Sequence, residues 1–344
     1  MQKKLYAGRP CVRLDDGKVA KQNKGTFIWA ALLHLGMNMW HDQMAPLKPV
    51  RDHLWFDENV WRDVTQAMHD VGMNMVVIDL GEGMAFKKHP ELAVKGTWSQ
   101  DKMRRELDRL RGLGLEPIPK LNFSSLHDAW LGEYQWMLST PEYYQVVEDT
   151  IGEAIEVFGK PRFMHLGWDE EENGGLQQQY ALRLERHGDL WWHDFLFTLK
   201  EVEKWGVRPW AWHAREFDEW TARCPKSVLT SHAYYGRTFD VNKVDCGRFI
   251  SAEYLGPAIR RYQGLDKAGY DQIPCATTWV PTYYKEFNLR GNDVNFPLTV
   301  AHCRNVLSSE RLKGFLMAPW VPTDAKNRNI LLHSIDLVGQ SMKI

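Results

Sequence analysis

Short apolar segments alternate with amphipathic helical stretches along most of this chain. The apolar segments have the length and composition of strands, and turn residues separate them from the stretches with helical spacing. This alternation is typical of βα units, which assemble into a parallel sheet. Eight segments are predicted to be strands, and they are Phe27–His34, Met75–Leu80, Glu116–Leu121, Arg162–Gly167, Pro209–His213, Ser227–Ala233, Cys275–Val280 and Phe315–Trp320.

Helical stretches fill most of the intervals between these strands. Thr140 and Pro141 form a strong helix start, because Thr caps a helix and Pro fits its first position. With 344 residues, the chain has the usual size of one (β/α)8 TIM barrel, and an open doubly wound sheet is the alternative. We assign residues 1–25 to an N-terminal extension and residues 26–344 to the barrel. The predicted helices are Glu58–Val71, Gln100–Leu113, Pro141–Phe158, Leu190–Trp205, Leu298–Ser308 and Ile330–Gly339.

Composition excludes several classes of function. The formal net charge is −1, so no basic excess indicates binding to nucleic acid or to an anionic membrane. The polar start of the chain has no secretory signal, which favours a cytoplasmic location, or an exported one if a signal peptide was removed. Five scattered cysteines form no disulfide framework. We expect no cofactor, no nucleic acid or membrane partner, and an oligomeric state that the sequence leaves open.

A cluster of carboxylates follows the fourth predicted strand directly. The run Arg162–Gly167 leads into Trp168, Asp169, Glu170 and Glu171. TIM-barrel enzymes place their active sites at the C-terminal ends of the strands. Because side chains alternate along a strand, Asp169 and Glu170 can face one pocket only if the strand ends there and the backbone turns. The sequence therefore predicts a turn at this point.

The ends of the other predicted strands carry carboxylates, imidazoles and aromatic rings. A glycosidase needs a carboxylic acid for the leaving oxygen, a second polar group for the oxocarbenium-like centre, and apolar walls for the sugar. The 16 tryptophans suit such walls, although most of them are expected in the core. The candidate residues for binding a carbohydrate substrate are Asp79, Glu82, Asn122, His127, His165, Trp210, Trp212, Tyr234, Tyr235, Trp279, Tyr283 and Trp320.

Asp169 and Glu170 are the candidate catalytic residues. A charged Asp169 beside a buried Glu170 disfavours ionisation of the glutamate, which then serves as a general acid. We expect the next two glutamates, Glu171 and Glu172, to face solvent. A metal-dependent hydrolase is a rival, because His165 and Asp169 share a strand face. The chain has no HExxH helix, however, and no metal is predicted.

Several motifs in the first half of the chain resemble those of family 20 glycoside hydrolases, the β-N-acetylhexosaminidases. The run His165–Glu170 is similar to the family's His-x-Gly-Gly-Asp-Glu motif. Upstream, Gly96–Gln100 resembles the segment before a family helix, and Gly114–Lys120 resembles the third strand. His127 sits near the histidine of the family's Pro-Gly-His motif.

The resemblance implies a role for each matching residue. Glu170 would be the general acid/base, and Asp169 would orient the 2-acetamido group, whose carbonyl oxygen is the nucleophile. This is substrate-assisted retention, in an enzyme that acts at the end of a sugar chain. A tyrosine would hold the acetamide oxygen, and Tyr234, Tyr235 and Tyr283 are all candidates. Tryptophans at the ends of the fifth, seventh and eighth strands resemble the aromatic cage of the family.

The chain also departs from the family pattern. Trp168 replaces the second glycine of the motif, and Lys120 and Asn122 replace acids of the third strand. These changes leave two alternatives open. One is a glycosidase for sugars without an acetamido group, with Asp79 or Glu82 as the second carboxylate. The other is a barrel that binds carbohydrate without turning it over.

Overall fold

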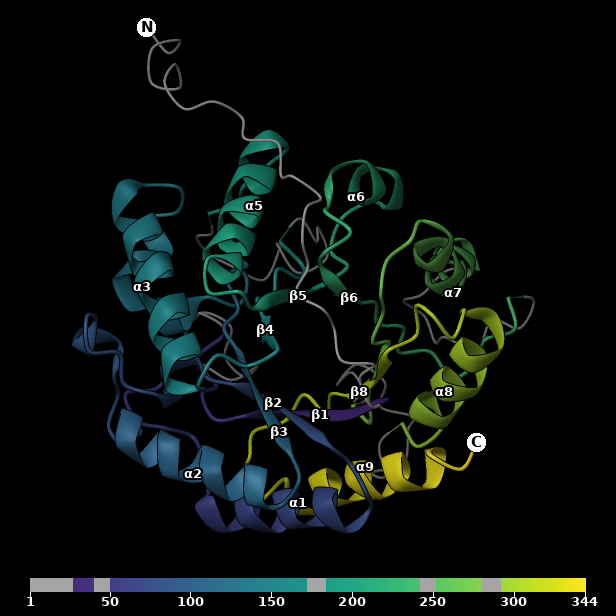
Figure 1. Ribbon diagram of the computed structural model, residues 1–344, viewed down its shortest axis with the longest axis horizontal. Helices are drawn as coiled ribbons and strands as arrows, with labels where there is room; N and C mark the ends of the chain where they lie inside the picture. Colours follow the sequence, from purple (N-terminus) through teal and green to yellow (C-terminus); the bar gives the residue numbers. More distant parts are fainter. Residues whose placement is uncertain (1–26, 40–49, 172–183, 242–251, 280–291) are drawn as a thin grey trace, which may run out of the picture.

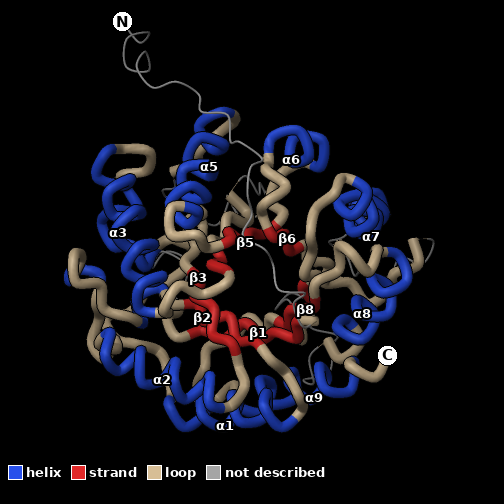
Figure 2. The backbone as a smooth tube through the Cα atoms, in the orientation of Figure 1, coloured by secondary structure: helices blue, strands red, loops and turns tan. Residues whose placement is uncertain are grey.

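Eight parallel strands line the centre of the molecule, and helices surround them (Figure 2). The computed structural model describes residues 27–39, 50–171, 184–241, 252–279 and 292–344. The predicted N-terminal extension, residues 1–25, therefore lies outside the described part of the chain. The strands are β1 (Ile28–His34), β2 (Met75–Asp79), β3 (Glu116–Lys120), β4 (Phe163–His165), β5 (Arg208–Trp212), β6 (Leu229–Ser231), β7 (Cys275–Ala276) and β8 (Gly314–Met317).

The strand order confirms the predicted barrel. The sheet runs β6-β5-β4-β3-β2-β1-β8-β7, so the first strand pairs with both the second and the eighth. Two isolated bridges, Thr230↔Gln272 and Ala233↔Cys275, join the remaining edges near β6 and β7. The doubly wound alternative is wrong, because an open sheet would not bring its two edge strands together.

The helices form an outer ring around the strands (Figure 1). Thr140 caps α3 as predicted, since its Oγ1 accepts a hydrogen bond from the amide of Tyr143 at 3.2 Å. Helices α6 and α7 were not predicted; α7 carries Pro257 in its interior, which weakens its helical pattern. The helices are α1 (Glu58–Asp70), α2 (Gln100–Gly112), α3 (Pro141–Val157), α5 (Asp189–Glu203), α6 (Phe217–Arg223), α7 (Ala252–Lys267), α8 (Asn295–Val306) and α9 (Arg328–Ser341), with 3₁₀ segments η2 (Gly81–Gly83), η3 (Pro90–Leu92) and η4 (Ala129–Trp136).

The strands bury side chains on both of their faces. The outer faces pack against the helices, where Trp168, Trp191 and Trp220 are almost fully buried. The inner faces form a second cluster that includes Val77, Ile118 and several other apolar side chains. Continuous apolar strands are expected when both faces of a parallel sheet are covered.

The inner face becomes polar near the C-terminal ends of β1 to β4. The strand register pairs His34 with Asp79, Asp79 with Lys120, and Lys120 with His165. All four side chains are buried. Charged groups at this level lie directly below the barrel rim, where the sequence places the catalytic residues.

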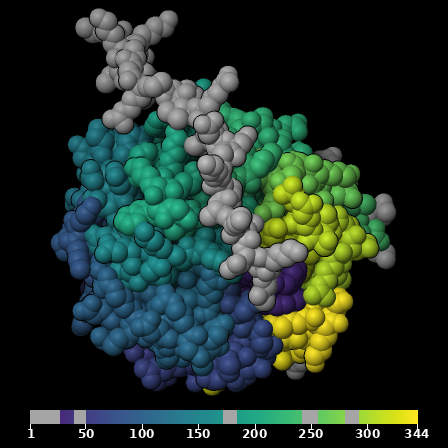
Figure 3. Space-filling view, viewed as in Figure 1, coloured from purple at the N-terminus to yellow at the C-terminus, as the bar shows by residue number. Residues whose placement is uncertain are grey.

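The chain follows the barrel wall in sequence order, so its first and last described parts meet. In the space-filling view, the purple β1 region lies beside the yellow C-terminal region (Figure 3). None of the helices in the described ranges has the length and apolar character that a membrane crossing requires.

Candidate active site

The backbone turns sharply where β4 ends. Gly167, Trp168 and Glu170 all have positive φ, at 71°, 71° and 64°. Left-handed backbone is uncommon for residues other than glycine and is concentrated at functional sites. Gly167 has no alternative, because a Cβ there would lie 2.0 Å from Oδ1 of Asn122. The turn predicted from the alternation of side chains is confirmed.

Trp168 points away from the barrel mouth and anchors the turn. Its side chain is fully buried against Trp191 and Phe195, and its indole N–H donates to Oγ1 of Thr198 on α5 at 3.0 Å. Its amide donates to Oδ1 of Asn122. A large side chain therefore fits at this position because it enters the core between the strands and α5, while the next two residues stay at the rim.

His127 brings the two candidate catalytic carboxylates together. Its Nε2 lies 3.1 Å from Oε2 of Glu170 and 3.4 Å from Oδ2 of Asp169. Asn122 donates from Nδ2 to Oδ1 of Asp169 at 2.8 Å, and the hydroxyl of Ser124 donates to the backbone carbonyl of Asp169. Loops after β3 and β4 thus form one cluster at the C-terminal end of the barrel.

The electrostatics of the cluster favour an ion pair. Burial opposes the charge on His127, but the carboxylates of Asp169 and Glu170 outweigh it and raise the pKa of the imidazole to about 10. Burial would also raise the pKa of Asp169, yet His127, followed by Lys120 and Asn122, lowers that pKa below its usual range. His127 is therefore protonated, and Asp169 ionised, at neutral pH.

We expect His127 to keep its proton to a pH near 10. Because the folded pKa lies above the ordinary value of 6.5, the ion pair stabilises the fold fully below pH 6.5 and loses its effect as the pH rises toward 10. An NMR titration of imidazole resonances should show this raised pKa. The unfolding free energy of the wild type should also fall as the pH rises between these values. Compared with His127→Gln, the fall should be on the order of a few kcal/mol larger. A His127 that titrates near 6.5 would contradict the ion pair.

Two expectations about the glutamates were wrong. The side chain of Glu170 is 43% exposed, so burial beside Asp169 does not isolate it from water. The side chain of Glu171 is only 1% exposed instead of facing solvent, and Arg186 pairs with it at 2.7 Å. Glu170 therefore points out of the turn and Glu171 points into the protein. Glu172 lies outside the described residues.

The other predicted polar candidates are buried and bonded to the protein. Asp79 lies 2.6 Å from Nζ of Lys120 and 3.2 Å from Nδ1 of His34; burial opposes its charge, but Lys120 and then His34 lower its pKa to about 2. Glu82 accepts hydrogen bonds from the amides of Met37 and Asn38. Neither carboxylate is thus left as an exposed nucleophile, as the alternative mechanism would require.

His165 lies in the barrel interior below the carboxylates. It is fully buried, and its Nδ1 accepts a hydrogen bond from the amide of Gly167 at 3.1 Å. Burial lowers its pKa well below the ordinary value. A neutral ring with this hydrogen bond carries its proton on Nε2. Its ring centroid is 4.5 Å from that of Trp212.

The predicted aromatic residues divide between the rim and the interior. Trp320 donates from Nε1 to the hydroxyl of Tyr235 at 3.0 Å and packs 5.7 Å from Trp212, while Tyr235 is 6.5 Å from Trp279. These four rings form a continuous row, in which Tyr235, Trp279 and Trp320 are partly exposed and Trp212 is buried. Trp210 and Tyr234 lie inside the protein instead, where they donate to Ser231 and to the carbonyl of Thr238. Tyr283 lies outside the described residues.

One group of described residues has the spacing of a metal site. Potential ligand atoms of His127, Asp169 and Glu170 all lie within 4.8 Å of one another. A histidine binds a metal through an unprotonated nitrogen. The carboxylates that hold the proton on His127 are the same groups that would bind a metal, so a metal and the imidazole proton compete for this point.

Sequence reasoning missed three charged residues near the site, namely Lys120, Asp128 and Arg186. Lys120 was recognised only as a departure from the family pattern, although its position at the end of β3 matches that of Asp79 on β2. Asp128 is buried beside His127, and burial raises its pKa well above the ordinary value. Arg186 gives no sequence signal, because the separations between it and its partners match no local spacing rule.

Comparison of the fold with solved structures gives consistent neighbours. A β-N-acetylhexosaminidase from Bacteroides fragilis is 13% identical and superimposes with a TM-score of 0.56, over 90% of this chain and 65% of its own length. A family 20 β-N-acetylhexosaminidase from Streptomyces coelicolor is 12% identical, with a TM-score of 0.57 over 90% and 64%. A Streptomyces plicatus β-hexosaminidase variant in complex with the product GlcNAc is 14% identical, with a TM-score of 0.60 over 91% and 64%.

These likenesses concern the fold. The barrel of this chain has the same fold as these β-N-acetylhexosaminidase structures. The chain spans about two thirds of the length of these neighbours. No family model matches the sequence, and no curated protein matches it.

Proposed function

We propose that this protein is a retaining, exo-acting glycoside hydrolase for β-N-acetylhexosaminides. One observation carries the proposal: Asp169 and Glu170 lie side by side on the turn after β4, and His127 contacts both. The position is the one at which barrel enzymes have their active sites. The fold shared with β-N-acetylhexosaminidases supports the same function.

Each carboxylate has a distinct task in this mechanism. Glu170, whose side chain is 43% exposed, takes up a proton from water in the substrate complex and donates it to the glycosidic oxygen as the bond to C1 breaks. The imidazolium of His127 then stabilises the carboxylate that Glu170 becomes. Asp169, kept ionised by His127, accepts a hydrogen bond from the acetamide N–H and orients the carbonyl oxygen toward C1. The carbonyl oxygen bonds to C1 as the glycosidic bond breaks, which gives a cyclic intermediate. Glu170 finally removes a proton from the water that attacks C1 and releases the acetamide oxygen.

Among the tyrosines in the described ranges, Tyr235 is the one best placed to hold the acetamide oxygen. Burial, and to a smaller extent Cys275 and then the charges of Glu170 and Asp169, raise the pKa of its hydroxyl well above the ordinary value, so it remains a hydrogen-bond donor. Trp320 donates to the same oxygen, which leaves the hydroxyl proton of Tyr235 available for the substrate. Tyr234, in contrast, donates to the carbonyl of Thr238.

We expect Asp169→Asn to lower kcat/KM for acetamido sugars by about 10²-fold or more, because the orienting charge is lost. The measurement compares aryl β-N-acetylglucosaminide and β-N-acetylgalactosaminide with the matching plain β-glucoside, for the wild type and the variant. The wild type should prefer the acetamido substrates, and the variant should lose most of this preference.

Two outcomes would contradict the proposal. A wild type that hydrolyses the plain glucoside as well as the acetamido sugar would exclude assistance by the substrate. A wild type that binds these sugars in calorimetry without hydrolysing any of them would indicate a binding barrel. Asp101→Asn, an exposed aspartate in the first turn of α2, is a suitable control and should leave kcat/KM unchanged.

A further inference from the structure

A fully buried arginine lies behind the catalytic turn. The side chain of Arg186 is 1% exposed, and its Nε, Nη1 and Nη2 all donate hydrogen bonds to protein oxygens. Its guanidinium also lies 4.3 Å from the ring of Trp168. A buried charge is costly unless it is well paired, so this degree of satisfaction indicates a site built around the guanidinium.

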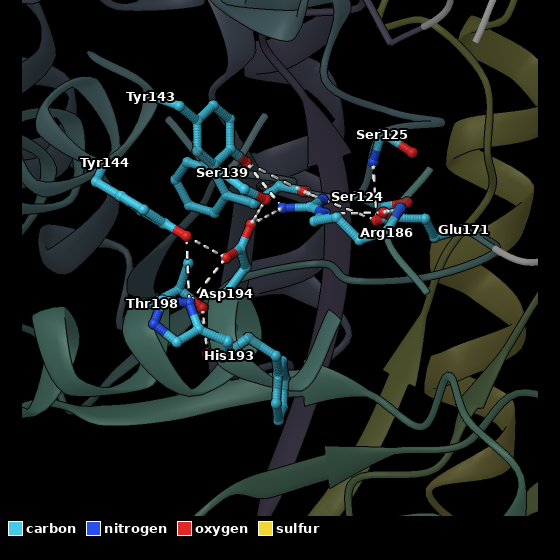
Figure 4. A network of polar contacts seen from close by, with 12 residues as sticks. Ser124, Ser125, Ser139, Tyr143, Tyr144, Glu171, Arg186, His193, Asp194 and Thr198 are labelled. Carbon is cyan, nitrogen blue, oxygen red and sulfur yellow. Dashed lines mark hydrogen bonds and ion pairs between the residues drawn. The ribbon is translucent and has the colours of Figure 1, made fainter. Parts of the chain in front are cut away.

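The first partner of Arg186 is the residue that follows Glu170. Nε donates to Oε1 of Glu171 at 2.8 Å, and Nη2 donates to Oε2 at 2.7 Å. This is a two-point contact that only a planar guanidinium makes. Figure 4 shows Arg186 and Glu171 in this arrangement, with Asp194 on the other side of the guanidinium.

The same unit holds the loop that carries His127. Nη2 of Arg186 donates to the carbonyl of Phe123 at 2.6 Å, and the amide of Ser125 donates to Oε2 of Glu171 at 3.2 Å. Phe123 and Ser125 follow β3, a few residues before His127. The ion pair of Arg186 and Glu171 therefore connects the backbone just before His127 with the residue just after Glu170.

A third set of contacts connects the ion pair to the helices. Nη1 of Arg186 donates to Oδ2 of Asp194 on α5 at 3.2 Å and to the hydroxyl of Tyr143 on α3 at 3.3 Å. Asp194 also accepts hydrogen bonds from Tyr144 and Ser139 (Figure 4). The two catalytic loops are thus held against the rigid outer ring of the barrel.

We propose that Arg186 is a positioning residue: by binding Glu171 in two points and the carbonyl of Phe123, it holds Glu170 against His127. This inference rests on the glycoside hydrolase function proposed above. The contact between His127 and Glu170 is 3.1 Å long, and hydrogen bonds weaken quickly beyond this range. A displacement of about 1 Å is enough to cost 10²-fold in rate. In this scheme Arg186 does not contact the substrate and does not take part in the proton transfer.

The test replaces the two-point contact while keeping the charge. Arg186→Lys retains a cation but cannot bind both oxygens of Glu171 in the same plane. We expect kcat to fall by about 10–100-fold, with KM changed by less than about threefold, because alignment and not substrate binding is lost. Glu171→Gln keeps the shape of the partner and should show the same pattern more weakly.

A second measurement does not depend on activity. In Arg186→Lys and Glu171→Gln, His127 loses its close contact with Glu170, so the NMR-determined pKa of His127 should move down from about 10, while Asp169, the larger cause of the raised pKa, still holds it above 6.5. Arg208→Lys serves as the matched control. Arg208 pairs with Asp271 and the carbonyl of Ser227 near the start of β5, with 16% side-chain exposure. This variant should lose stability without moving the pKa of His127.

The outcomes separate this inference from the proposed function. Lowered melting temperatures together with an unchanged His127 titration, and with kcat per folded molecule unchanged, would show that Arg186 is merely structural and would overturn the inference. If the wild type hydrolyses no glycoside, the proposed function fails, yet the His127 titration still decides whether Arg186 positions the pair. If Arg186→Lys does not fold, Glu171→Gln provides the same titration.

Discussion

Glu170→Gln should lower kcat/KM for β-N-acetylhexosaminides by about 10²–10⁴-fold, the usual contribution of a general acid. Glutamine has nearly the size of glutamate, and its side-chain oxygen can still accept the hydrogen bond from His127. The local geometry should therefore survive. What it removes is the proton that Glu170 gives to the leaving oxygen. The assay measures steady-state hydrolysis of a disaccharide substrate and of aryl substrates by the wild type and the variant.

The choice of leaving group sharpens this experiment. A nitrophenolate leaves with little help from an acid, whereas a sugar hydroxyl needs a full proton. The deficit of Glu170→Gln should therefore increase as the leaving group becomes more basic. Glu133→Gln, which changes an exposed carboxylate on η4, should behave as the wild type. A Glu170→Gln enzyme with the wild-type rate on the disaccharide would remove Glu170 from the catalytic role.

The barrel could be predicted from the sequence because its strands leave a strong local signal. Segments such as Met75–Ile78 are apolar on both faces, as a strand covered on both sides is expected to be. Short elements left weaker signals. Helix α6 spans only Phe217–Arg223, and α7 contains a proline, so neither was predicted. The bridges that join β6 to β7 depend on single residue pairs that no periodicity indicates.

The turn at β4 was predictable for a geometric reason. Asp169 and Glu170 are neighbours, and neighbours on a strand face opposite ways, so a shared pocket requires a bend. The positive φ values of Trp168 and Glu170 are the result. The partner of the next residue was not predictable in this way. Glu171 pairs with Arg186, and no spacing rule connects an acid at a strand end with an arginine 15 positions later.

The ion pair of Asp79 and Lys120 below the site could have been predicted from the sequence. Asp79 and Lys120 occupy matching positions at the ends of adjacent parallel strands, and both follow apolar segments. Opposite charges at the same register of two neighbouring buried strands are expected to pair, because either charge would be costly to bury alone. Asp79 was instead predicted to bind substrate, because the C-terminal ends of barrel strands are where active sites form.

Lys120→Met should destabilise the fold by about 3–5 kcal/mol, because it leaves the carboxylate of Asp79 buried without its cation. The side chain of Lys120 is 1% exposed, and that of Asp79 is 7% exposed. Equilibrium denaturation in urea at neutral pH measures the difference in unfolding free energy. The matched comparison is the double variant Lys120→Met/Asp79→Asn, which removes both charges and should recover most of the loss.

The pH dependence gives this prediction a second check. Lys120 and His34 lower the folded pKa of Asp79 from 3.8 to about 2, so the ion pair stabilises the wild type above pH 3.8 and is lost as the pH falls toward 2. In Lys120→Met, burial acts on Asp79 without the ammonium group, so this carboxylate takes up its proton at a higher pH. The stability difference between wild type and variant should therefore shrink as the solution is acidified. A difference that is constant with pH, or a double variant as unstable as the single one, would show that the loss of Lys120 acts through packing and not through charge.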